Sequence, residues 1–92
     1  MTRSFKDEAT KDLFETGVSR QWGSIQSVAR RKLDQIEAAA NLNDLKVPPG
    51  NRLEPLKADR TGQHSIRIND RYRICFEWEP DGAHNVEIAD YH

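Results

Sequence analysis

Two neighbouring segments in the second half of the chain alternate apolar and polar residues, and this pattern constrains the fold more than any other. Successive side chains of a β-strand point to opposite faces, so residues 64–68 and residues 72–78 each present one apolar face. Asn69 and Asp70 stand between them and favour a turn. The two segments therefore predict a β-hairpin, and its buried face is expected to carry Ile66, Ile68, Tyr72, Ile74, Phe76 and Trp78.

The first half of the chain has the three- and four-residue apolar spacing of helices. Residues 24–40 form the clearest predicted helix, with Ser24 as its expected N-cap. One face of this helix collects Ile25, Val28, Ala29, Leu33, Ile36 and Ala40. Residues 6–16 predict an earlier helix, because acids stand in its opening turn, where the helix dipole favours them, and Gly17 follows as a stop.

Shorter segments complete the order of elements. Residues 2–5 are expected to form a first strand, and residues 86–88 a closing strand after a turn at residues 79–82. Two prolines in residues 47–51 prevent a helix there and predict a loop. The order is β-α-α-β-β-β, which predicts an α+β fold with two N-terminal helices packed on one face of a small, mostly antiparallel sheet. A chain of 92 residues buries one core, so residues 1–92 are expected to be a single domain.

Charge is distributed unevenly along a nearly neutral chain. The net charge is −1 at pH 7, which by itself argues against a nucleic-acid partner. Residues 52–73, however, carry six Lys or Arg and three acids, whereas residues 74–92 carry five acids and no Lys or Arg. If the first segment lines one surface, that surface has a local positive field.

Cysteine content and hydropathy indicate the cellular compartment. The single cysteine, Cys75, has no partner for an intramolecular disulfide, and the N-terminal residues lack the apolar run of a secretory signal. No segment approaches the roughly 20 apolar residues that cross a bilayer. We therefore expect a cytoplasmic protein without a membrane role.

The strand alternation places basic residues on the face of the sheet away from the helices. If the isoleucines point toward the helices, Arg67, Arg73 and Tyr91 point the other way. Two guanidinium groups, with Lys57 and the C-terminal His92 nearby, resemble a phosphate-handling site, because arginine offers a planar fork of donors that keeps its charge. Exposed arginines on sheets are also common as solubilising residues, and chain ends commonly fray. Spacing alone therefore leaves the function open.

The residues themselves are similar to a known family. Residues 52–76 read RLEPLKADRTGQHSIRINDRYRICF, and the chain ends in Asp90-Tyr91-His92. This pattern resembles HigB-type toxins of the RelE/ParE toxin superfamily, and the likeness extends over nearly the whole chain. It implies a ribosome-dependent mRNA endoribonuclease of a type II toxin–antitoxin system, which cuts the message in the ribosomal A site and is neutralised by a HigA-type antitoxin. It also implies 2′-hydroxyl attack without a metal or cofactor, and contact with operator DNA only through the antitoxin.

The resemblance implies roles for particular side chains. Lys57, Arg67 and Arg73 are expected around the scissile phosphate, where their charges stabilise the transition state. Tyr91 and His92 match the family's terminal catalytic residues. His92 is the expected proton-transfer group, since an unperturbed imidazole has a pKa of roughly 6.5.

Glu54 departs from the pattern, because some relatives are expected to carry a second histidine at this position. Its carboxylate can act as a base, pair with Lys57 or Arg73, or weaken RNA affinity by placing negative charge near phosphate. We expect Glu54 to pair with one of these two basic residues.

Three further positions are expected to support the site or to bind RNA. They are Arg60, His64 and Asp90. Asp90 either orients the terminal residues that follow it or only ends its strand. For the antitoxin, the exposed face of the second helix, with Arg30 and Arg31, is one candidate surface.

Two other functions are open at this stage. One is a gyrase-inhibiting toxin with the same fold, against which Lys57 and the Asp90-Tyr91-His92 ending argue. The other is a non-catalytic module that binds RNA or an antitoxin.

Overall fold

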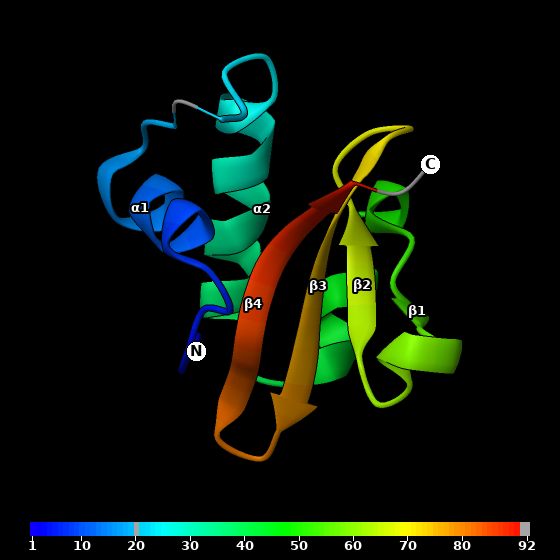
Figure 1. Ribbon diagram of the computed structural model, residues 1–92. Helices are drawn as coiled ribbons and strands as arrows, with labels where there is room; N and C mark the ends of the chain where they lie inside the picture. Colours follow the sequence, from blue (N-terminus) through cyan, green and yellow to red (C-terminus); the bar gives the residue numbers. More distant parts are fainter. Residues whose placement is uncertain (20, 91–92) are drawn as a thin grey trace.

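The computed structural model describes residues 1–19 and 21–90. In this part of the chain two α-helices pack on one face of a four-stranded sheet (Figure 1). The helices are α1 (Glu8–Thr16) and α2 (Gln26–Ala38). The strands are β1 (Glu54–Pro55), β2 (His64–Arg67), β3 (Tyr72–Glu79) and β4 (Gly82–Asp90). They lie in the order β1-β2-β3-β4, and every neighbouring pair is antiparallel. The predicted α+β class is confirmed.

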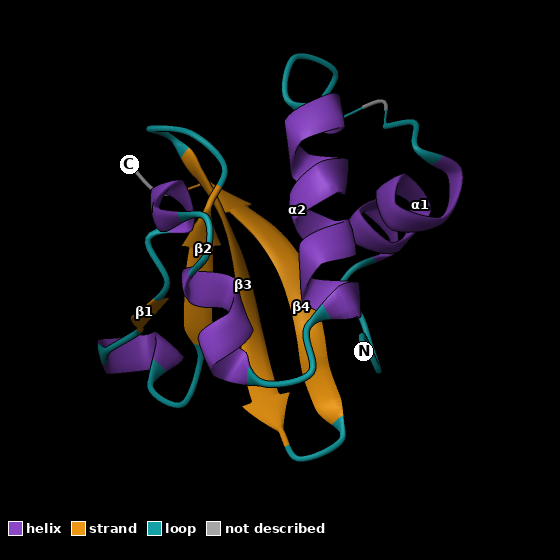
Figure 2. Cartoon of the chain, turned by 180° about the vertical axis from the view of Figure 1, so that it is seen from behind, coloured by secondary structure: helices purple, strands orange, loops and turns teal. Residues whose placement is uncertain are grey.

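Three short 3-10 helices lie between α2 and β2. They are η1 (Leu42–Lys46), η2 (Pro49–Asn51) and η3 (Ala58–Arg60). Leu45 of η1 belongs to the same buried cluster as the apolar residues of α2 and of the sheet, so η1 covers the sheet on the side that α2 covers (Figure 2).

Helix α1 is capped at both ends. The Asp7 carboxylate accepts a hydrogen bond from the Thr10 backbone N–H at 2.7 Å, so the helix begins at Glu8 and not at residue 6 as predicted. Gly17 has a φ of 79° and donates its N–H to the Leu13 carbonyl, which confirms it as the stop. The buried Thr10 hydroxyl accepts from the Ile88 N–H at 3.2 Å, and this contact ties α1 to β4.

Helix α2 corrects two details of the prediction. Its N-cap is Ile25, which makes no side-chain capping bond, so the expected cap at Ser24 is wrong. The helix ends at Ala38, and Ala40 is outside it. The reason lies in η1, because the Asp44 carboxylate accepts from the backbone N–H groups of Ala40 and the next residue and so draws the chain into a new turn.

The expected first strand is reduced to two isolated parallel bridges, Thr2 with Ala83 and Phe5 with Val86. Asn85, with a φ of 53°, lies in β4 between these two bridges, and its N–H donates to the Ser4 hydroxyl at 2.9 Å. The sheet gains β1 instead, which sequence reasoning missed because it has two residues and one is a proline. The predicted closing strand at residues 86–88 extends to the whole of β4.

The two faces of the sheet bury different residues. Toward the helices lies the main core, which confirms the predicted inward face through Ile66, Ile68, Ile74, Phe76, Val86 and Ile88. The alternation predicted a polar opposite face, but this face also carries buried apolar residues. Leu56, which follows β1, forms a second buried cluster on it with Cys75 and Ala89. An apolar side chain after β1 gains by leaving water, and this draws its segment onto the sheet.

Candidate active site

Arg67 and Arg73 are directly opposite each other in the register of β2 and β3. They lie on the face away from α1 and α2, because Ile66 and Ile74, the neighbouring pair in the register, belong to the main core. Side chains opposite each other on antiparallel strands have Cβ atoms roughly 5 Å apart, so two cationic side chains start from neighbouring positions on this face. The structure thus brings together two of the residues that the sequence singled out.

Arg73 is held by three other segments. Its Nε donates to the Ser65 hydroxyl at 2.7 Å, and its Nη2 donates to the Arg52 carbonyl at 2.9 Å. The same Nη2 lies 3.3 Å from Glu54 Oε1, which confirms the expected pairing of Glu54. The Arg73 side chain is 13% exposed, so its plane is set by the protein.

Sequence reasoning missed Ser65 and the Arg52 carbonyl. Ser65 stands two residues before Arg67 and is fully buried on the same face. This period-two position was a signal that could have identified it. No sequence signal could have identified the Arg52 carbonyl, because every residue has a backbone carbonyl.

The segment that ends in Arg52 is anchored by the fully buried Asn51. The Asn51 amide nitrogen contacts the carbonyls of Leu45 and Val47 at 3.2 and 3.4 Å, and its oxygen accepts from the Lys32 amine of α2. Burial lowers the pKa of Lys32, with a smaller contribution from the neighbouring Arg31 charge. The Arg52 carbonyl that holds Arg73 therefore depends on a hydrogen-bond network on the helix side of the molecule.

Arg67 is held more loosely than Arg73. Its Nη2 pairs with Asp70 in the hairpin turn, and the Asp70 side chain is 99% exposed. Exposed ion pairs of this kind contribute little to stability, typically about 0–1 kcal/mol. The Asp70 pairing therefore fixes Arg67 only weakly.

Lys57 lies beside this face without a partner among the described residues. It precedes η3 and is exposed, whereas the adjacent Leu56 packs on Cys75 and Ala89. The Leu56 N–H donates to the Gln63 carbonyl, so the backbone at Lys57 lies near the His64 end of β2, whereas Arg67 stands at the other end of that strand.

Arg60 has a structural contact. Its Nη1 lies 3.1 Å from Glu87 of β4 and 3.1 Å from the Gln63 side chain. Lys6 reaches the same Glu87 oxygen at 3.2 Å. These contacts hold η3 to β4.

His64 is not brought to the arginine cluster. It pairs in register with Phe76, and the two rings stack with centroids 6.4 Å apart. Its Nδ1 is buried and has no hydrogen-bond partner in the described part of the chain. His64 thus belongs to the side of the sheet that faces the helices.

Asp90 ends β4 and pairs with Arg71. Its Oδ2 accepts from Arg71 Nε at 3.0 Å and from Nη2 at 2.8 Å. This hydrogen bonding and the charge of Asp90 raise the pKa of Arg71. The expected catalytic residues Tyr91 and His92 lie outside the described residues.

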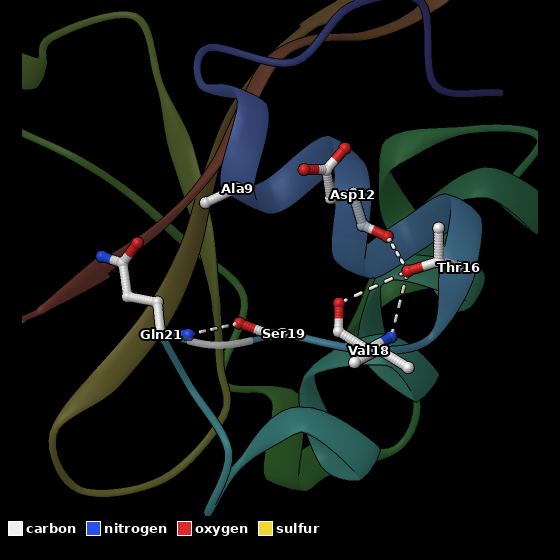
Figure 3. A pocket seen from close by; sticks show the side chains of 6 residues that line it. All are labelled: Ala9, Asp12, Thr16, Val18, Ser19 and Gln21. Carbon is white, nitrogen blue, oxygen red and sulfur yellow. Dashed lines mark hydrogen bonds between the residues drawn. The ribbon is translucent and has the colours of Figure 1, made fainter.

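A hollow away from the arginine pair does not carry this chemistry. It is shown in Figure 3 and lies between α1 and the loop after it, where the Thr16 hydroxyl donates to the Asp12 carbonyl at 2.7 Å. Asp12 is its only ionisable lining residue among those described. Over residues 1–19 and 21–90, no three His, Cys, Asp or Glu side chains gather as metal ligands, and no helix has the length and apolar character to cross a membrane.

Comparison with known families matches residues 3–92 to the HigB-like toxins, described as the RelE-like toxin of the type II toxin–antitoxin system HigB. The chain belongs to this family. Toxin HigB-1 of Vibrio cholerae is 38% identical to this HigB-family chain over 90 residues, which cover 96% of the chain and 95% of the relative. A protein named Endoribonuclease HigB, from Proteus vulgaris, is 35% identical over the full length of both.

Solved structures confirm the RelE-like fold. A chain of the YoeB-YefM complex from Staphylococcus aureus superposes with a TM-score of 0.62 at 16% identity, covering 100% of this chain and 98% of that one. The YoeB/ParE toxin from Agrobacterium tumefaciens gives a TM-score of 0.56 at 19% identity, with 98% and 99% covered. At these identities the likeness concerns the fold alone.

Proposed function

We propose that this chain is a ribosome-dependent endoribonuclease toxin that cuts mRNA in the ribosomal A site. The observation that carries the proposal is the Arg67–Arg73 pair on the face away from the helices, with Arg73 held in one orientation by Ser65 and the Arg52 carbonyl. The full-length relative named as an endoribonuclease supports the same reaction class.

The arrangement suits cleavage by an internal nucleophile. The 2′-hydroxyl attacks the adjacent phosphate, a base accepts its proton, and the 5′-oxygen leaves with a proton from an acid, giving a cyclic phosphate and a 5′-hydroxyl. Negative charge builds up on the phosphate oxygens during this step, and fixed donors stabilise it without reorganising. Every bond and proton in this reaction is accounted for without a metal ion.

Particular roles follow from the geometry and the family resemblance together. Arg73 is the oriented donor to phosphate, because its guanidinium is planar, permanently charged and held in place. Arg67 adds positive charge from the same face, and Lys57 is proposed to add charge on the resemblance alone. Tyr91 and His92 are proposed as proton-transfer groups on the resemblance alone.

The proposed partner is a HigA-type antitoxin, which alone would contact operator DNA. Arg30 and Arg31 are exposed on α2 and lie with Gly17 and Asp34 around a shallow hollow. Replacing both arginines with Glu is expected to weaken complex formation with a HigA-type antitoxin, as measured by calorimetric titration.

The decisive experiment maps the ends of a message translated in vitro with and without the protein. The proposal expects cuts within codons, in frame, only when ribosomes occupy the message. If mRNA without ribosomes were cut equally well, the proposed ribosome dependence would be wrong. An intact message together with a DNA-damage response in cells that express the protein would favour the gyrase-inhibitor alternative.

A further inference from the structure

Glu54 lies where an RNA phosphate is expected to meet Arg73. Its Oε1 is 3.3 Å from Arg73 Nη2, and its side chain is 52% exposed, whereas that of Arg73 is 13% exposed. The carboxylate is therefore the member of the pair that solvent reaches more easily.

The other partners of Arg73 are neutral and leave one edge of the guanidinium for an anion. Nε donates to Ser65, and one Nη2 proton goes to the Arg52 carbonyl. Glu54 Oε1 forms an ion pair with Nη2 at 3.3 Å, while Nη1 makes no hydrogen bond to a described residue. Arginine binds phosphate best through two parallel N–H groups, and here the available pair is Nη1 with Nη2. The Glu54 carboxylate therefore lies beside the Nη2 member of that pair.

We propose that Glu54 is a built-in competitor for the RNA phosphate: its carboxylate neutralises Arg73 in the free protein and must yield when the phosphodiester binds. The inference rests on the proposed function and adds a determinant of RNA affinity to it. Ser65 and the Arg52 carbonyl keep Arg73 oriented after Glu54 leaves. The neutral partners thus set the geometry, and the acid lowers the affinity for RNA away from the ribosome.

The test is Glu54→Gln, which removes the charge, keeps the size and alters an exposed position. Binding of a fluorescently labelled single-stranded RNA decamer is measured by anisotropy with purified protein. We expect about fivefold tighter binding at low salt, which corresponds to about 1 kcal/mol, the upper range for an exposed ion pair. The difference should vanish near 1 M salt, where the Debye length falls to about 3 Å.

Two controls separate this effect from a general change of charge. Glu79→Gln removes the same charge at the exposed far end of β3 and should change binding by much less. In an Arg73→Ala background, Glu54→Gln should have no remaining effect. A persisting gain there, an equal gain from Glu79→Gln, or unchanged binding by Glu54→Gln would each overturn the proposal.

Cleavage on programmed ribosomes gives a second readout. Competition predicts that Glu54→Gln lowers KM and leaves kcat unchanged. A fall in kcat at constant KM would instead make Glu54 part of the chemistry and reject its role as a competitor. If the wild-type protein cuts no message but the binding results hold, the proposed function fails and the competition at Arg73 stands.

Discussion

The two faces of the sheet differ in what holds them together. The face toward α1 and α2 buries a continuous apolar core that includes the fully buried Ile74 and Phe76. The other face has three small or medium apolar residues, Leu56, Cys75 and Ala89, beside the arginine pair. Stability is therefore concentrated on one face, and the groups able to bind an anion on the other. Substitutions on the two faces should separate these properties.

The largest expected effect is on stability, from Phe76→Ala. Phe76 is fully buried, and its ring packs against His64 and Trp78. Removing a buried phenyl ring typically costs about 3–5 kcal/mol in the free energy of unfolding. Urea denaturation followed by circular dichroism measures this. A loss below ~1 kcal/mol would mean that the main core does not dominate stability.

Next comes Arg73→Ala, whose effect should appear in activity. Loss of one oriented donor to transition-state charge commonly costs about 10²–10³ in rate. Cleavage on programmed ribosomes measures the rate, and thermal unfolding serves as the check that the variant is folded. Full activity in a folded variant would contradict the assignment of Arg73.

Asn51→Ala is expected to lower both stability and activity. It therefore tests whether the two properties can be changed separately at every position. Asn51 bonds to Lys32 and to two backbone carbonyls, and its loss leaves buried polar groups unpaired. We expect a cost of about 2–3 kcal/mol in unfolding free energy. The adjacent Arg52 carbonyl should also lose its position, so that activity falls in conditions where the protein remains folded. Activity equal to wild type would separate Asn51 from the site.

The smallest effect is expected from Asp70→Asn. Asp70 is almost fully exposed and pairs with Arg67, so the change in stability should stay within about 0.5 kcal/mol. Since Arg67 loses a competing anion, RNA binding by anisotropy should be equal to or slightly tighter than that of the wild type. Clearly weaker binding would show that Asp70 orients Arg67.

Local patterns predicted the elements that carry strong periodicity. Alternation in residues 64–68 and 72–78 identified the hairpin and its buried face, and Gly17 was identified as a helix stop from residue type alone. Predictions that depended on weak local signals fared less well, since the cap at Ser24 is wrong and the strand at residues 2–5 is reduced to two isolated bridges. A short strand or a cap is decided by whichever distant group offers a hydrogen bond, and local propensity does not contain that information.

For the candidate site, the sequence by itself determined that Arg67 and Arg73 would share a face, because strand alternation is local and two strands joined by a short turn must pair. Only the tertiary structure decided what holds Arg73. Its contact with the Arg52 carbonyl joins residues 21 positions apart, and Leu56 covers the face beside it only after β1 has paired with β2. Such contacts come from burial and hydrogen bonding between distant segments, which no local sequence pattern contains.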